Sequence, residues 1–279
     1  MNARTTYHNA PTQAIDVGGT QFAYRRLGPD TGVPLILLHH LGAVLDNWDP
    51  RVIDGIAAHR RVIAFDNRGV GASKGRTPTS VDAMAQDAVA FIRALGFDQV
   101  DLLGFSLGGF VAQAIVQQHP RLVRKLVLAG TGPAGGEGID KVTRMTILAM
   151  LQGALTVRDP KTYLFFARTA NGKSAARAFM KRLQERTDDR DKAISPLAFR
   201  AQLKAISAWA RQPPSDLSSI RQPTLVANGD DDLMVPSTNS ADLARRLPDA
   251  RLKLYPDAGH GGVFQCHDEF MADLLEFLS

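Results

Sequence analysis

Gly104-Phe105-Ser106-Leu107-Gly108-Gly109 is a Gly-x-Ser-x-Gly turn with a serine at its apex. The apolar run 100–103 precedes it and the helix-like stretch 110–118 follows it, so the sequence predicts a strand, a sharp turn and a helix. Glycines two residues before and two residues after Ser106 remove the Cβ atoms that would clash in a strained turn. The turn therefore predicts a serine hydroxyl that stands clear of the sheet and is aimed as a nucleophile.

The helix after this turn is expected to begin at Leu107, whose amide points towards the space in front of the serine. First-turn amides have no acceptor inside their own helix, so this one can donate to a developing oxyanion. The other interpretation of Ser106 is that it only caps the helix. The strand before the turn and the helix after it favour the nucleophile.

A serine nucleophile needs a base, and the base needs a group that orients it. The buried strand expected at 223–229 ends in Asp230-Asp231-Asp232, and the strand expected at 251–255 is followed by a loop that contains His260. These candidates all follow the carboxyl end of a predicted strand, which is where ligands bind in open α/β sheets. The sequence therefore predicts that Ser106 and His260 act with one of the three aspartates.

Five motifs in this order resemble those of the α/β-hydrolase superfamily, over most of the chain. The greatest similarity is to its branch of small bacterial esterases, lactonases and cofactor-free haloperoxidases. The motifs are the strand and oxyanion loop at 35–42, the Asp-x-Arg-Gly-x-Gly-x-Ser turn at 66–73, the serine turn, the acid loop from Gly229 to Asp232 with Pro236, and the histidine loop Gly259-His260.

The resemblance assigns roles that the residues alone leave open. Its spacing selects Asp232 as the acid, and its oxyanion loop makes the amide of Leu41 the second oxyanion donor. Its motif usually has glycine where this chain has His40, so the backbone turn there departs from the pattern. His40 is either a local change of geometry or a side chain that reaches the substrate, whereas His39 fits a packing or hydrogen-bonding role.

The chain has 279 residues, of which 44% are hydrophobic, and this is ample for a full core. No run approaches eighteen apolar residues and residues 1–13 are polar, so we expect neither a membrane span nor a secretory signal. The single cysteine, Cys266, excludes an intramolecular disulfide and fits a reducing, cytoplasmic location.

The net charge of +5 does not predict nucleic-acid binding. Between residues 173 and 192, basic side chains alternate with acidic ones at helical spacing, which is typical of a solvated helix face. The chain has no basic stripe interleaved with aromatic residues. We therefore expect a small-molecule partner, with neither nucleic acid nor a membrane, and the composition leaves a homo-oligomer open.

Strand-like runs alternate with longer amphipathic segments. A hairpin is expected at 13–26 around Gly18-Gly19, and the clearest helix runs from the cap Ser80 to the stop at Gly96. This alternation predicts the α/β class, with a mostly parallel central sheet flanked by helices, and the resemblance implies that this sheet has the α/β-hydrolase fold. Further strands are expected at 34–39, 61–66, 100–104 and 125–129.

The alternation breaks after residue 129, where a glycine-rich linker leads into helical periodicity from 139 to 212. We read 133–214 as a helical cap and 1–132 with 215–279 as the hydrolase core. Large apolar residues of the cap are candidates for a pocket wall, which favours an apolar or aromatic substrate portion. The cap candidates are Met145, Leu148, Leu151, Phe165, Phe166 and Trp209, and the substrate-binding set is His40, Phe105, Met145, Leu148, Phe166 and Trp209.

These features predict a serine hydrolase that cleaves a carboxylic ester or lactone of a small, largely apolar substrate through an acyl-enzyme. No zinc-ligand spacing and no phosphate loop occurs in the sequence, so we expect neither a metal nor an organic cofactor. A perhydrolase of the haloperoxidase type or a carbon–carbon bond hydrolase would use the same triad, and a ligand receptor on a hydrolase scaffold is the alternative from another class. An epoxide hydrolase or haloalkane dehalogenase is disfavoured, because it needs a carboxylate where this chain has Ser106.

Overall fold

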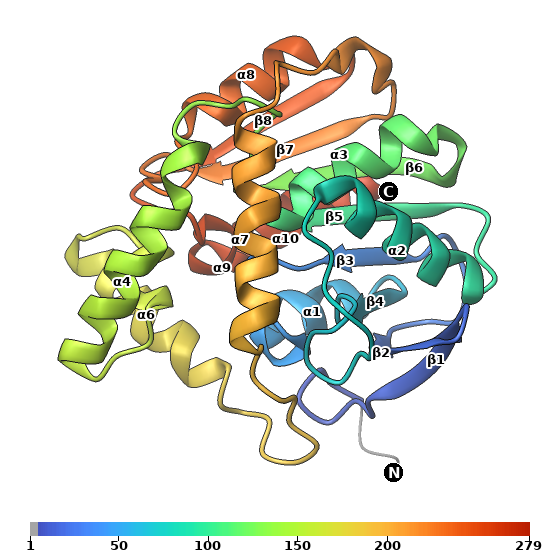
Figure 1. Ribbon diagram of the computed structural model, residues 1–279, viewed down its shortest axis with the longest axis horizontal. Helices are drawn as coiled ribbons and strands as arrows, with labels where there is room; N and C mark the ends of the chain where they lie inside the picture. The colour runs from blue at the N-terminus through green and yellow to red at the C-terminus, as the bar shows by residue number, and fades with distance from the viewer. Residues whose placement is uncertain (1–4) are drawn as a thin grey trace.

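The computed structural model describes residues 5–279, and within them the central sheet has eight strands in the order β1-β2-β4-β3-β5-β6-β7-β8 (Figure 1). β1 and β2 form the expected antiparallel hairpin at one edge, and β2 pairs antiparallel with β4. All pairings from β4 to β8 are parallel, which confirms the predicted fold class. The strands are β1 (Gln13–Val17), β2 (Thr20–Leu27), β3 (Leu35–Leu38), β4 (Val62–Phe65), β5 (Val100–Phe105), β6 (Val123–Ala129), β7 (Thr224–Gly229) and β8 (Ala250–Tyr255).

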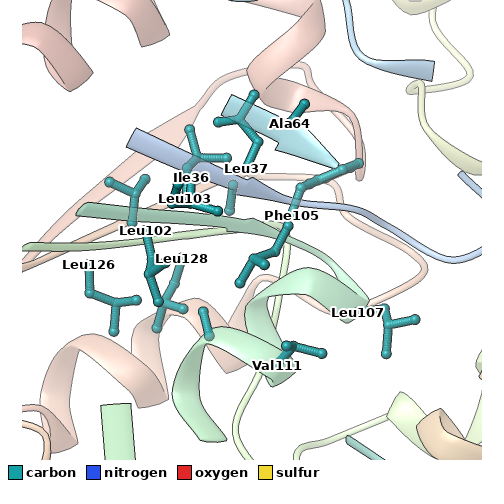
Figure 2. Close-up of a cluster of buried hydrophobic side chains, with 14 of the residues drawn as sticks. Ile36, Leu37, Ala64, Leu102, Leu103, Phe105, Leu107, Val111, Leu126 and Leu128 are labelled. Carbon is teal, nitrogen blue, oxygen red and sulfur yellow. The ribbon is translucent and has the colours of Figure 1, made fainter. Parts of the chain in front are cut away.

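Every residue of β3, β4, β5 and β7 is buried. Both faces of the sheet are therefore covered, and helices cover them. α2 (Val81–Ala94) packs against α3 (Leu107–Gln118), and α1 (Pro50–Ala57) packs against α10 (His267–Leu278). In Figure 2, Leu126 and Leu128 of β6 lie on the same side of the sheet as Val111 of α3. The core therefore forms around continuous apolar strands rather than around strands with one wet face.

The ends of α2 follow the signals in its sequence. Ser80 is extended, and its side chain accepts a hydrogen bond from the amide of Ala83. Gly96, just past the last turn, has a φ of +81°, a conformation that glycine adopts without steric cost. Both the cap and the stop are therefore confirmed.

The segment between β6 and β7 contains helices and no strand of the sheet (Figure 1). α4 (Val142–Thr156) packs against α5 (Lys161–Leu164) and α7 (Pro196–Ala210), and α6 (Ala170–Arg182) contacts α9 (Gly262–Gln265). α8 (Thr238–Arg246) returns to the sheet and packs on β7 and β8. Among the helices of residues 5–279, none has the length and apolar character needed to cross a membrane.

Two hydrogen bonds fix this helical segment over the carboxyl ends of the strands. The amide of Gly261, in the loop after β8, donates to the carbonyl of Phe165 at 2.6 Å. The amide of Gly42, in the loop after β3, donates to Oε1 of Gln202 on α7 at 2.7 Å. The inserted segment is therefore hydrogen-bonded to the loops that carry the candidate site.

A buried ion pair ties the same segment to the body of the protein. The guanidinium of Arg182 in α6 donates to both carboxylate oxygens of Asp49, the residue that caps α1, at 2.6 to 3.0 Å. Asp49 is fully buried, so removal of Arg182 would leave a buried charge without its main partner. The position of the helical segment is thus set by specific contacts and not by the linker alone.

Candidate active site

Ser106 lies at the junction of β5 and α3 with φ +55° and ψ −117°. This backbone conformation is strained for a residue with a side chain, and such strain concentrates at functional sites. Four hydrogen bonds hold it in place. The amide of Ser106 donates to the carbonyl of Ala129, and the Ser106 carbonyl accepts from the hydroxyl of Thr131 and from the amides of Gly109 and Phe110. The surrounding chain therefore stabilises a turn that the serine by itself would not adopt.

The two glycines of the turn are required by close backbone approach. A Cβ added at Gly104 would lie 2.3 Å from the carbonyl oxygen of Gly108, and one added at Gly108 would lie 2.0 Å from the carbonyl oxygen of Leu38. The first contact lets the chain reverse sharply around Ser106. The close contact between Gly108 and Leu38 packs the first turn of α3 against the end of β3. The Leu107 amide therefore lies beside the loop that contains Leu41.

The acid loop after β7 and the histidine loop after β8 meet through one hydrogen bond. Nδ1 of His260 lies 2.8 Å from Oδ2 of Asp232. The other carboxylate oxygen accepts from the amides of Met234 at 2.8 Å and Val235 at 3.0 Å. A carboxylate oxygen can only accept a hydrogen bond, so Nδ1 of His260 is the donor in this pair.

Asp232 differs from the two aspartates before it. Its side chain is buried, whereas Asp230 and Asp231 are exposed. Asp230 accepts only a long bond from the amide of Ala258, at 3.4 Å. Of the three aspartates, Asp232 is the one that the structure places against His260.

Ser106 and His260 line the same cavity, whose volume is about 380 Å³. Both are largely shielded, with exposed fractions of 6% and 1%. Because Nδ1 of His260 is engaged by Asp232, its Nε2 is left with a lone pair, which is the form that a base needs to take a proton from serine. Leu41 also lines the cavity, while the side chain of Leu107 is fully buried behind it.

The cavity wall is mostly apolar and includes one ion pair. Lys161 lies 3.1 Å from Asp159, so the two charges offset each other. The apolar members are Leu41, Met150, Pro160, Leu164, Phe165, Ile194, Pro196, Phe199 and Met234. The remaining members besides Ser106 and His260 are His40, Gly42, Thr146, Asp159 and Lys161.

His40 fits into this wall among aromatic rings. Its Nδ1 lies 2.9 Å from the carbonyl oxygen of Leu41, and its ring is in T-shaped contact with the rings of Phe105 and Phe165, at centroid distances of 5.4 and 5.0 Å. Burial lowers the pKa of His40 well below its usual value, and the nearby Lys161 cation lowers it further. His40 is therefore neutral and close to the candidate nucleophile.

His39 takes the packing position expected of it. It is buried, with its ring centroid 5.8 Å from that of Trp48, and burial lowers its pKa to about 3. Cys266 is half-buried, and burial raises the pKa of its thiol, so it has the character of a packing residue rather than of a nucleophile.

The structure corrects much of the pocket wall expected from sequence. Of that substrate-binding set only His40 lines the cavity, and Phe105 packs behind it against the rings of His40 and His260. Phe166 is buried in the core, and Trp209 stacks on Phe110 at 5.4 Å.

On α4 the prediction selected the wrong face. Met145 packs against the core and Leu148 is 54% exposed, whereas Thr146 and Met150, one turn apart, face the cavity. Periodicity gives the spacing of a helix face but not its partner, which is why these side chains were misassigned. Phe165, a cap candidate left out of the substrate-binding set, does line the cavity.

Comparisons with known proteins identify the family to which this fold belongs. A family model described as the alpha/beta hydrolase fold matches residues 33–265. The solved structure of an alpha/beta hydrolase fold protein from Chitinophaga pinensis superposes with a TM-score of 0.95 at 40% identity, over 99% of each chain. RutD of Agrobacterium fabrum, named as a candidate carbamate hydrolase, is 31% identical over 89% of this chain and 94% of its own. A non-heme haloperoxidase of Rhodococcus erythropolis is 29% identical over 93% of this chain and 96% of its own.

Proposed function

The chain belongs to the α/β-hydrolase family, and we propose that it is a serine hydrolase that cleaves a carboxylic ester or lactone of a small, largely apolar substrate through an acyl-enzyme. The observation that carries the proposal is the buried hydrogen bond between His260 and Asp232 at a cavity that also contains Ser106 in a strained turn. A nucleophile, a base and a group that orients the base are the parts that acyl transfer requires.

In the proposed reaction Nε2 of His260 takes the hydroxyl proton of Ser106 while Oγ of Ser106 attacks the carbonyl carbon of the substrate. Asp232 holds the imidazole in the required tautomer and stabilises it when it becomes charged. The amides of Leu107 and Leu41 donate to the oxyanion, and each donor of this kind contributes roughly 3 kcal/mol to the transition state. His260 returns the proton to the leaving alcohol and then activates the water that releases the acid.

The cavity supports a small and mainly apolar substrate. Its volume of about 380 Å³ is at the lower end of the usual range for ligand pockets, which begins near 300 Å³. The Lys161–Asp159 pair adds no net charge, so the wall offers little to attract a strongly anionic molecule. These features favour a neutral ester over a charged one.

We further propose that residues 133–214 act as a cap over a core made of 1–132 and 215–279. Four of the inserted helices surround the cavity or contact its loops, and members of the cavity wall come from both parts of the chain. A cap of this kind would exclude water and shape the acyl or alcohol site. The lone cysteine fits a reducing compartment such as the cytoplasm.

A hydrolysis screen tests the proposal. Purified protein is offered aryl esters, alkyl esters, lactones and aryl carbamates, with Ser106→Ala as the control. Peracid formation would use the same acyl-enzyme, and carbamate cleavage would form a carbamoyl-enzyme on the same serine. We expect turnover of at least one short aryl ester that disappears in the alanine variant. Tight retention of a ligand without turnover would instead support a receptor and contradict the proposal.

A further inference from the structure

A second cavity of the protein is a groove between the inserted helices and the body of the fold. Its volume is about 490 Å³, and in the part of the chain that the structure describes it shares no lining residue with the cavity of Ser106. One wall comes from the loop 69–79 before α2, and the other comes from the stretch 195–204, which contains the start of α7 (Figure 1). We call it the basic groove.

The basic groove contains three cations without a counter-charge. Arg76 lines it from the core loop, and Arg200 and Lys204 line it from α7. All three side chains are exposed, and none of them makes an ion pair or a hydrogen bond within residues 5–279. No aspartate or glutamate of the described chain is among the residues that line the groove.

The spacing of these cations is unfavourable unless an anion lies between them. Arg200 and Lys204 are four residues apart on α7, so they share one face of the helix, and like charges at this spacing destabilise it. Arg76 adds a third positive charge from the opposite wall. A cleft lined by charge of one sign concentrates ions of the other sign. The arrangement therefore favours a ligand with more than one negative charge.

The core wall of the groove is fixed before any ligand binds. The amide of Gly69 donates to the carbonyl of Lys74 at 3.0 Å, and the hydroxyl of Thr77 donates to the carbonyl of Arg68 at 2.9 Å. These bonds define the path of the backbone on both sides of Arg76. A site with a fixed backbone loses less conformational entropy when it binds a ligand.

Neutral donors and an apolar side chain complete the groove. Thr79 and Ser195 contribute hydroxyls, and Oγ of Ser195 accepts from the amide of Ala198 at 3.2 Å, which leaves its own proton available to a ligand. Leu197 is another lining residue, and it is 80% exposed. The hydroxyls suit the oxygens of an anion, whereas the leucine suits an organic group.

We propose that the basic groove binds a small phosphate ester. Such a group has about 1.5 to 2 negative charges at neutral pH, and the guanidinium of arginine matches the geometry of its oxygens. The volume of the groove lies in the usual range for small-molecule pockets, about 300–1,000 Å³, so an organic portion can lie beside Leu197.

The bound ester would touch both walls of the groove and hold α7 against the core loop. The same helix places Phe199 in the cavity of Ser106, so the second site would also fix one wall of the first. The inference does not depend on the reaction proposed for Ser106.

The test is isothermal titration calorimetry of the wild-type protein with phenyl phosphate and with inorganic phosphate, at one ionic strength set with chloride. The double variant Arg200→Gln with Lys204→Gln removes the cations of α7, and Arg76→Gln removes that of the core loop. Arg211→Gln is the matched control, because Arg211 is an exposed cation at the other end of α7. We expect phenyl phosphate to bind at one site, the double variant and Arg76→Gln each to weaken it at least about tenfold, and the control to change it less than about twofold.

Three outcomes would overturn the proposal. The first is that phenyl phosphate at millimolar concentration does not bind the wild-type protein. The second is that Arg211→Gln weakens binding as much as the double variant does, which would be a response to net charge alone. The third is that inorganic phosphate binds as tightly as phenyl phosphate, which would exclude an organic ligand.

Hydrogen exchange locates the bound ligand. With phenyl phosphate, the backbone amides of 69–79 and of 195–204 should exchange more slowly together, because the ligand contacts both walls. Slower exchange confined to the loops 40–42 and 260–262 would place phenyl phosphate in the cavity of Ser106 and contradict the proposal.

Discussion

Nδ1 of His260 lies 2.8 Å from Oδ2 of Asp232, and both side chains are almost completely buried. The two residues are 28 positions apart in the chain but follow neighbouring parallel strands, in which Gly229 of β7 is in register with Tyr255 of β8. The shared edge of the sheet therefore brings the two loops together. The remaining carboxylate oxygen is occupied by two backbone amides, so Asp232 has one orientation in which to hold the imidazole.

Asp232→Asn should reduce kcat by about 10⁴-fold, because an amide can stabilise the wrong tautomer of His260 and cannot offset its charge. Asp230→Asn and Asp231→Asn are the matched controls, since both side chains are exposed, and each should cost less than about tenfold. The measurement is steady-state hydrolysis of the best aryl ester. A larger loss in either control than in Asp232→Asn would show that the acid is assigned to the wrong residue.

Ser106→Ala should lower ester turnover by at least about 10⁴-fold while the thermal unfolding midpoint stays close to that of the wild type. The hydroxyl makes no hydrogen bond on which the fold depends, since the bonds at this turn use the backbone of Ser106. An organophosphonate should label Ser106 and no other serine, as read by mass spectrometry of peptides. Undiminished hydrolysis by the alanine variant would remove the proposed mechanism.

The buried ring of His39 should make stability depend on pH. Its pKa in the folded protein is about 3, whereas an unfolded histidine titrates near 6.5. Between these values the unfolded chain binds a proton that the folded chain does not, so the free energy of unfolding falls as pH drops below about 6.5. The expected slope is up to about 1.4 kcal/mol per pH unit.

The check is urea unfolding at pH 7, 6 and 5 for the wild type and for His39→Gln, which has no titrating ring. His40 acts in the same direction and Asp66, whose pKa is raised mainly by burial, acts in the opposite one, but both are present in the two proteins and cancel in the difference. The variant should lose less stability on acidification. Parallel curves for the two proteins would mean that His39 does not titrate as described.

Phe199→Ala should change substrate preference, because its ring lines the cavity from α7. Removing the ring enlarges the cavity. The ratio of kcat/KM for longer acyl esters to kcat/KM for the acetate ester should therefore rise by about tenfold. Trp209→Ala, on the same helix, is the matched control. Its ring stacks on Phe110 in the core, so its loss should lower stability by about 3–5 kcal/mol without changing the order of preference.

Relative kcat/KM values over a series of acyl lengths, together with urea unfolding, separate the two variants. The opposite result would be a changed acyl-length preference in Trp209→Ala at preserved stability, with an unchanged preference in Phe199→Ala. It would show that the substrate lies against the Trp209 side of α7.

The sequence alone determined the parts of the site that depend on local backbone geometry and chain order. The strained turn is predictable from Gly104, Ser106 and Gly108, because only glycine allows the close backbone approach that the turn requires. In this structure a Cβ at Gly104 or Gly108 would lie 2.3 or 2.0 Å from a backbone carbonyl oxygen. The loops with Asp232 and His260 were predictable because carboxyl ends of parallel strands share one edge. The alternation of strands and helices, and its interruption after β6, were predictable from the periodicity of apolar residues along the chain.

Only the tertiary structure decided which side chains face the cavity and what they can do there. Helical spacing could not distinguish Thr146 and Met150 from Met145 and Leu148, since the choice depends on where α5, α7 and the loops of the sheet meet α4. It also decided the state of His40, because the tautomer is set by a carbonyl 2.9 Å away and the neutral charge by burial that no single residue type encodes. Local signals specify a backbone, whereas the direction of a side chain and its protonation depend on neighbours that are distant in the sequence.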